Sequence, residues 1–273
     1  MTKFSERKFF AVSAGRCFCG HYCYIRACKT TYYSEKVGQM GKPVLRPTGE
    51  DSYVIAYVPA ADGDDFDFGK ELARSRRQEE ERDFEGACNT RLHAFRRLVD
   101  IIPDEGETVL EWEDGNTQAA VLTGYCSGID HFLAGDWEMA AAIFEMLLDI
   151  DPEDHTEATV PLAYTYVAME EYESFDDIIN DVNDKYIDKV VLTLWSEYRR
   201  TGVLPHGEMV RLRSRFRPYY DEFLAAEHPV SDAYLADIRS EHPSKEALAR
   251  ELWLQTEHLW TLFPGFVEAL GRA

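Results

Sequence analysis

The sequence lacks the features that identify a membrane protein, an exported protein or a familiar enzyme. No uninterrupted apolar run approaches the roughly 18 residues that a membrane-spanning helix needs. The short apolar stretch from Phe9 to Gly15 meets Arg16 at once, which argues against a signal peptide. There is no G-x-S-x-G element, no phosphate-binding Gly-Lys-Ser/Thr loop and no G-x-G-x-x-G element. We therefore expect a cytoplasmic protein that is not an enzyme.

Positive charge is scarce outside the first 50 residues. The chain of 273 residues holds 29 Lys and Arg against 50 Asp and Glu, a net charge of −21. Residues 1–50 carry nine basic and three acidic residues, a balance of +6, so the other 223 residues carry −27. Because affinity for phosphate comes largely from Lys and Arg, nucleic acid and anionic lipid are disfavoured as partners. The acidic body is expected to maintain solubility or, alternatively, to bind a basic partner.

Cysteine is too sparse for a disulfide scaffold, with six residues in the whole chain. Four of them fall within one stretch of twelve residues: Cys17, Cys19, Cys23 and Cys28. Thiolates bind zinc tetrahedrally, and four in a short loop can close a structural site. The Cys-x-Cys-Gly start is similar to the SEC-C zinc motif, whose last Cys is followed directly by Cys or His. Here that place is Lys29, so Cys23 or His21 would have to supply the fourth ligand.

The alternative for this cluster is a set of reduced, unliganded thiols in a loosely ordered leader. Elemental analysis of the purified protein separates the two hypotheses: zinc at stoichiometric level supports the metal site, and its absence removes it. Cys88 and Cys126 lie on helical faces and are expected to be small buried apolar residues. No His-x-x-x-His pair occurs among the eight histidines, so each is expected to be a surface or capping residue.

Three segments follow one another along the chain. Residues 1–50 are a basic leader that contains the cysteine cluster. Residues 51–113 form a mixed segment, with a strand at Tyr53–Val58, a second short strand at Thr108–Trp112 that could pair with it, and one long helix over residues 68–102. Residues 114–273 are a helical domain. In all we expect about ten helices and at most two short strands.

The clearest unit is a helix hairpin that ends at Asp151-Pro152. Apolar residues recur at helical spacing on both sides of a turn at Gly135-Asp136. Asp136 is placed to act as the N-cap of the second helix, because its carboxylate can accept the unpaired first-turn N–H groups. Such a hairpin must bury one face against a neighbour.

Parts of this hairpin recur along the sequence. The turn Gly135-Asp136-Trp137 and the turn Glu170-Glu171-Tyr172 lie 35 residues apart, close to the ~34-residue tetratricopeptide period. The second copy carries Pro161 inside its first helix, which shortens or kinks that helix. Its second helix is opened by Ser174. Upstream, residues 95–103 echo residues 144–152 and indicate a degenerate earlier repeat. Further helices precede Gly202 and Pro218, and the last begins at Pro243-Ser244.

The hairpin resembles a tetratricopeptide repeat. With the terminal proline of the repeat placed at Pro152, five signature positions agree: Gly128, Gly135, Trp137, Ala140 and Phe144. Small residues let two helices approach closely, and aromatic residues fill the groove between them. The resemblance implies an α-α superhelix of helix hairpins after a short N-terminal mixed segment, within a mainly α fold.

The C-terminal part is similar to suppressor-of-tumorigenicity-7-like proteins and their bacterial relatives. The similarity lies in residues 217–224, which begin Arg217-Pro218-Tyr219-Tyr220, and in residues 260–270, which contain Pro264-Gly265. Arg217 stands where that pattern has Asn, and the second proline of the pattern is missing. Together the two resemblances cover roughly residues 115–270. They imply a helical repeat domain used for protein contacts and no chemistry.

Six arginines stand out against the acidic body, namely Arg199, Arg200, Arg211, Arg213, Arg215 and Arg217. Two-residue spacing spreads the last four around more than half of a helix, so they do not form one stripe. We expect them to pair with acidic helices of the chain itself, the alternative being an external anion site. Neighbouring aromatic residues at helical spacing are expected in the core, although one or two could line a groove.

The sequence thus favours a scaffold or adaptor that binds a peptide or a partner helix on a concave face, without a cofactor. The competing hypothesis is a zinc-dependent adaptor that uses the cysteine cluster. A third hypothesis, an enzyme with an unfamiliar site, requires a deep pocket with converging titratable groups. The identity of the partner and the oligomeric state are not encoded in any motif of the chain.

Overall fold

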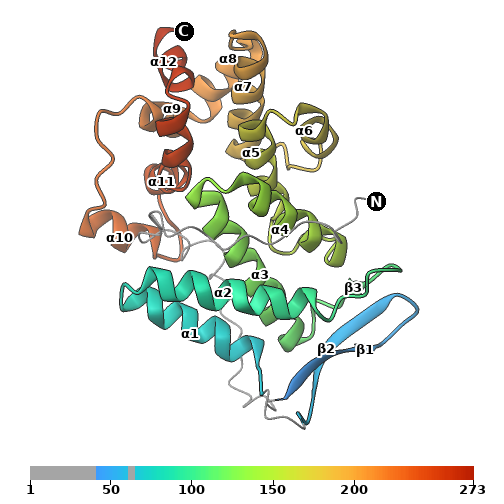
Figure 1. Cartoon of the computed structure of the whole chain (residues 1–273). Coiled ribbons are helices and arrows are strands. Elements are labelled where there is room, and N and C mark those ends of the chain that lie inside the picture. Colours follow the sequence, from blue (N-terminus) through green and yellow to red (C-terminus); the bar gives the residue numbers. More distant parts are fainter. Residues whose placement is uncertain (1–40, 61–64) are drawn as a thin grey trace. The chain divides into compact units, whose positions relative to one another are not determined.

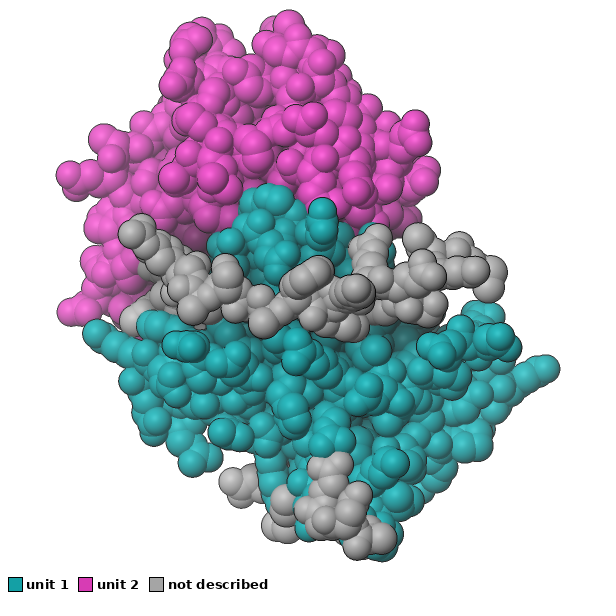
Figure 2. Space-filling view, in the orientation of Figure 1, with its two compact units in different colours: residues 1–21, 27–158 teal, residues 22–26, 159–273 magenta. Residues whose placement is uncertain are grey.

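The structure is a computed structural model that describes residues 41–60 and 65–273. Over these residues the chain forms twelve helices and three strands, which confirms the mainly helical class (Figure 1). The chain divides into two compact units, unit 1 and unit 2, coloured teal and magenta in Figure 2. Unit 1 extends to Ala158, and unit 2 takes in Thr159 to Ala273. Within the described ranges, no helix is long and apolar enough to cross a membrane.

A three-stranded sheet opens unit 1. β1 (Lys42–Pro47) and β2 (Ser52–Val58) form an antiparallel hairpin, and β3 (Val109–Leu110) pairs parallel to β2. The strand expected at Tyr53–Val58 and its pairing with a second strand near residue 110 are confirmed. β1 is a correction, because residues 42–47 were expected to belong to a loosely ordered leader.

Two prolines account for the missed strand. Pro43 and Pro47 lack the N–H group that a central strand donates, so they argue against a strand in the sequence pattern. The order of the sheet is β1-β2-β3, which places β1 at an edge. An edge strand tolerates proline because one side of its backbone needs no partner in the sheet.

Two helices replace the single helix expected over residues 68–102. α1 runs over Phe68–Glu80 and α2 over Phe84–Val99. Arg82 lies between them with a φ of 64°, in the left-handed region that a continuous right-handed helix does not contain. Asp83 then caps α2, since its Oδ1 accepts the N–H three residues further on at 3.0 Å. The expectation of one helix was wrong because most residues of the charged run favour helix, whereas the backbone conformation of Arg82 interrupts it.

A buried arginine links three helices of unit 1. Arg91, on α2, is 1% exposed. Its Nη2 lies 2.6 Å from Oε1 of Glu79, and its Nη1 lies 3.0 Å from Oδ1 of Asp130 on α3 (Gly115–Ala134). Its Nε donates to Oγ of Ser75 at 3.3 Å. One guanidinium group therefore connects α2 both to α1, which carries Ser75 and Glu79, and to α3.

α3 and α4 (Trp137–Ile150) form the hairpin that the sequence predicts, with Gly135 at the turn in the left-handed region at a φ of 75°. A Cβ added to Gly128 would stand 2.5 Å from Cε1 of Phe144, closer than real Cβ contacts allow. Phe144 is itself fully buried, at 0% exposure. The expected roles of Gly128 in close helix approach and of Phe144 in filling the groove are confirmed.

Asp136 occupies the N-cap position of α4, but its side chain makes no cap hydrogen bond. Its Oδ2 instead lies 2.9 Å from Nδ1 of His131, near the end of α3. Burial lowers the pKa of His131 from its ordinary value, and the hydrogen bond to Asp136 opposes that shift. The expected capping role of this carboxylate is therefore wrong. Asp136 joins α3 to α4 across the turn, and a buried imidazole is the partner that the local sequence did not indicate.

Unit 2 is helical throughout. Its helices are α5 (Thr159–Met169), α6 (Tyr172–Ile178), α7 (Ile187–Thr201), α8 (His206–Arg215), α9 (Arg217–Phe223), α10 (Asp232–Ile238), α11 (Lys245–Leu262) and α12 (Gly265–Arg272). The expected helix ends are confirmed at two places. Gly202 terminates α7 with a φ of 74°, and Ser244 caps α11 by accepting the N–H of Ala247 at 3.0 Å.

Two details at the start of unit 2 differ from the sequence analysis. α5 begins at Thr159, so Pro161 lies in its first turn, where the missing N–H has no helical partner to lose. α6 begins at Tyr172, so Ser174 lies inside the helix and does not cap it. Glu171 stands at the N-cap, and its side chain makes no cap hydrogen bond.

Aromatic rings from four helices meet at the centre of unit 2. Trp195 of α7 is fully buried, and its ring centroid lies 5.3 Å from that of Trp260 on α11. Phe223 of α9 and Phe266 of α12 lie 5.4 and 5.1 Å from the same ring. Trp260 also donates its Nε1–H to Oγ1 of Thr256 at 2.9 Å. Each aromatic pair contributes roughly 0.5–1.5 kcal/mol beyond its buried area, so this contact holds α7, α9, α11 and α12 together.

The finer architectural expectations stay predictions. These are the α-α superhelix of tetratricopeptide-like hairpins over residues 114–273 and the domain limits at residues 50/51 and 113/114. In the structure, the α3–α4 hairpin belongs to unit 1 and the helices from α5 onward belong to unit 2.

The contact between Gly128 and Phe144 leads to a stability prediction. Gly128→Ala should lower the free energy of unfolding by about 1–3 kcal/mol, because the added methyl group overpacks the α3–α4 interface. Gly115→Ala is the matched control in the same helix, since a Cβ there meets nothing within 4 Å. Urea denaturation followed by circular dichroism measures both. Adding Phe144→Leu should recover part of the loss in the Gly128→Ala variant, and equal effects of the two glycine variants would contradict this account.

Candidate binding surface on α8 and α9

The cysteines proposed as metal ligands, Cys17, Cys19, Cys23 and Cys28, lie outside the described residues. Over residues 41–60 and 65–273, no group of three or more His, Cys, Asp or Glu side chains is arranged to hold a metal ion. The other two cysteines, Cys88 and Cys126, lie on α2 and α3. Cys126 is buried as expected, at 5% exposure. Cys88 is only half-buried, so the expectation holds for it in part.

Two histidines were wrongly expected at the surface. His131 is 6% exposed and bonds Asp136, as described above. His228 has an 11% exposed side chain and bonds a carboxylate of α9. His155 is exposed, as expected, and its ring stacks on Trp112 with the two centroids 4.8 Å apart. The partners of these three histidines are either distant in the sequence or lie on the other side of a turn.

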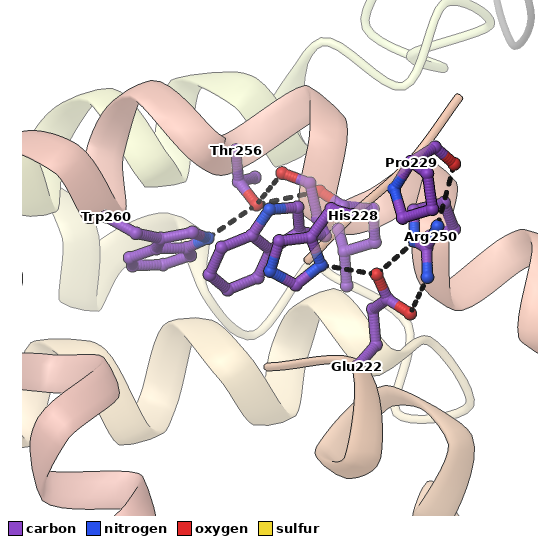
Figure 3. Close-up of polar contacts among 8 residues, drawn as sticks. Glu222, His228, Pro229, Arg250, Thr256 and Trp260 are labelled. Carbon is purple, nitrogen blue, oxygen red and sulfur yellow. Dashed lines mark hydrogen bonds and ion pairs between the residues drawn. The ribbon is translucent and has the colours of Figure 1, made fainter. Parts of the chain in front are cut away.

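A nearly buried carboxylate organises the link between α9 and α11 (Figure 3). Glu222, on α9, has a side chain that is 9% exposed. Its Oε2 accepts from Nη2 of Arg250 on α11 at 3.0 Å, and its Oε1 accepts from Nε of the same guanidinium. Nδ1 of His228 lies 2.6 Å from that Oε1. Arg250 also donates its Nη1–H to the backbone carbonyl of Pro229 at 2.8 Å. We call Glu222, His228 and Arg250 the carboxylate clamp.

Aromatic contacts complete this link. The His228 ring stacks on Trp253 with centroids 3.9 Å apart and an interplanar angle of 19°. Phe223, the neighbour of Glu222, meets the same tryptophan edge-on at 5.3 Å. The segment that follows α9 is therefore fixed to α11 by both charge and ring stacking. No local pattern could have indicated the clamp, because Glu222 and Arg250 lie 28 residues apart.

Four of the six arginines between residues 199 and 217 pair with acidic residues of unit 2, as expected. Arg199 bonds Glu170 and Arg200 bonds Asp176, both at 2.5 Å. The other two pairs are looser or more exposed. They are Arg211 with Glu208 at 3.4 Å and Arg217 with Asp221 at 2.7 Å.

Arg213 and Arg215 depart from this pattern, since neither has a carboxylate partner among the described residues. Arg213 donates to the Tyr220 hydroxyl at 3.3 Å and places its guanidinium 5.2 Å from the centroid of that ring. Arg215 is exposed, and its guanidinium lies 5.3 Å from the ring of Phe216. The expectation of internal pairing is therefore confirmed for four arginines and wrong for these two, because aromatic rings take the place of carboxylates.

Tyr220 collects two guanidinium groups. Arg217 lies 5.6 Å from its centroid, on the same ring that Arg213 approaches. Val210 is 50% exposed and stands three residues before Arg213, on the same side of α8. We call Val210, Arg213, Arg217 and Tyr220 the α8–α9 patch. It combines guanidinium donors, an aromatic ring and an apolar side chain, a composition that is common at protein interfaces.

No family model, no curated protein and no solved structure matches this chain. The similarity to tetratricopeptide repeats and to suppressor-of-tumorigenicity-7-like proteins therefore stays a prediction based on the residues quoted for it. The case for the candidate binding surface on α8 and α9 therefore comes from its contacts and distances.

The carboxylate clamp generates a second stability prediction. Glu222→Gln should lower the free energy of unfolding by about 1.5–3 kcal/mol, because hydrogen bonds to charged groups are lost and Arg250 keeps a charge without its carboxylate partner. The matched control is Asp221→Asn at the neighbouring position. It removes an exposed ion pair and should leave the urea midpoint unchanged. Equal midpoints for the wild type and Glu222→Gln would show that the clamp adds nothing to the stability of unit 2.

Proposed function

We propose that this protein is a non-enzymatic binding protein, a tetratricopeptide-like scaffold or adaptor that engages a peptide or helix of a protein partner. The observation that carries this proposal is the α8–α9 patch. It gathers arginine and tyrosine side chains beside an exposed valine. Arginine and tyrosine are among the residue types that contribute most binding energy at protein interfaces.

The way in which α9 is held supports the proposal. Tyr220 lies two residues before Glu222, which the carboxylate clamp fixes to α11. Phe223 is 1% exposed and packs on Trp253 and Trp260. One side of α9 is thus fixed, so Tyr220 is presented on a rigid helix. Binding to a preorganised surface loses less conformational entropy than binding to a mobile one.

The α3–α4 hairpin supports the tetratricopeptide-like part of the proposal. The contact between Gly128 and Phe144 joins two positions that the repeat signature pairs across its helices. The turn at Gly135 and the stop before Pro152 lie where that signature requires them.

Site-specific photo-cross-linking in the native cell tests the proposed function. A photoreactive amino acid is placed at Val210, in the α8–α9 patch, and separately at Ala73, an exposed position on α1. We expect one protein to be cross-linked in high yield from position 210 and not from position 73, and the purified pair to re-form a complex in isothermal titration calorimetry.

Two results would contradict the proposed function. One is the absence of any protein cross-linked from either position under conditions in which a known adaptor processed in parallel yields its partner. The other is a cross-linked protein whose purified form shows no heat of binding to the full chain. In either case, the helices would not be acting as a protein-binding surface.

A further inference from the structure

The charge in unit 2 is separated along the sequence. Residues 159–184 contain seven acidic residues and no basic one, whereas residues 199–217 contain six arginines and one glutamate. Two carboxylates of the first stretch pair with Arg199 and Arg200. The internal pairing leaves Arg213 without a carboxylate among the residues that the structure describes. Positive charge therefore remains available on α8 of a strongly acidic protein.

The geometry around Arg213 favours an incoming carboxylate. Its guanidinium lies over the Tyr220 ring, and the hydrogen bond to the hydroxyl uses one of its five N–H groups at 3.3 Å. Its other N–H groups have no carboxylate partner among the described residues and can form hydrogen bonds to an incoming carboxylate. Arg217 approaches the same ring. Arg217 already pairs with Asp221 at 2.7 Å, so among the described residues Arg213 is the guanidinium of the patch that lacks a carboxylate.

Charge complementarity thus points to one kind of occupant. We infer that the α8–α9 patch binds an acidic segment of a partner protein, with a carboxylate on Arg213 and an apolar side chain against Val210. This inference rests on the proposed function, because it names the chemistry of the partner at the same surface. It places carboxylate recognition on a protein whose own net charge is −21.

Screening lets a small basic patch act within an acidic surface. At physiological ionic strength the Debye length is about 8 Å, so the arginines in direct contact dominate over more distant carboxylates. A short acidic segment can remain within the patch. A nucleic acid gains affinity from many phosphates, whereas the chain carries 29 basic against 50 acidic residues. The observations therefore favour an acidic protein segment over nucleic acid.

Fluorescence anisotropy with the full chain tests the inference. The probe is a fluorescein-labelled peptide in which pairs of glutamates alternate with single leucines, and the control peptide has glutamine in place of glutamate. We expect saturable binding of the glutamate peptide that weakens as sodium chloride is raised, and little binding of the glutamine peptide. Arg213→Glu should weaken binding by about tenfold or more, which corresponds to the loss of a charged contact.

The matched control variant is Arg215→Glu. It makes the same change of charge on the same helix, two residues or about 200° further around it. We expect its affinity to stay within about twofold of the wild type. Tyr220→Ala leaves the net charge unchanged but removes the platform under Arg213, and should weaken binding several-fold. Circular dichroism and urea midpoints verify that each variant remains folded.

Three results would overturn the inference. The first is no binding of the glutamate peptide, and the second is an equal loss in Arg213→Glu and Arg215→Glu, which would indicate an effect of net charge alone. The third is equal, Arg213-dependent binding of a labelled oligothymidylate, which would identify a general polyanion site.

If a protein cross-linked from position 210 binds the Arg213→Glu variant as tightly as the wild type, the acidic-segment inference fails while the proposed function stands. If no such protein exists, the proposed function fails, and the peptide titration still reports on the patch.

Discussion

A guanidinium group in the interior of unit 1 sets a constraint on which the rest of that unit depends. Arg91 is 1% exposed, and its guanidinium pairs with Glu79 on α1 and with Asp130 on α3. Moving a charged group out of water costs several kcal/mol even after relaxation, and only close, well-oriented partners offset that cost. The three helices must therefore adopt the arrangement that brings these side chains together. A shift of one residue in α2 would leave a buried charge without its partners.

Unit 2 uses a related arrangement with the roles reversed. A carboxylate, Glu222, is nearly buried, and the basic partners Arg250 and His228 reach it from α11 and from the segment after α9. Neither network adds much net stability compared with apolar residues of similar volume, because desolvation cancels most of the attraction. The value of such networks lies in specifying one arrangement of helices. Around them, tight apolar contacts such as those of Trp260 supply the stabilising energy.

How much the sequence can predict depends on the range of each interaction. The turn at Gly135, the end of α7 at Gly202 and the cap of α11 at Ser244 were predicted because each is determined by a few adjacent residues. The break at Arg82 and the edge strand β1 were missed because propensity and proline content argue the other way. The Arg91 network and the carboxylate clamp were missed for a different reason. Their members lie up to 39 residues apart, so no period or motif connects them.

Arginines that hold the fold together differ from arginines that are available for binding in how far their charge is removed from water. Arg91 lies where water cannot solvate its charge, so partners must come from the chain itself. Arg213 is only half-buried, and water and the Tyr220 ring stabilise its guanidinium without a carboxylate. Leaving it unpaired costs little in the folded protein, whereas a partner that supplies a carboxylate gains a charge-assisted hydrogen bond. In a chain with an excess of acidic residues, an arginine near the surface that keeps an aromatic neighbour instead of an acidic one is therefore the residue to expect at an interface.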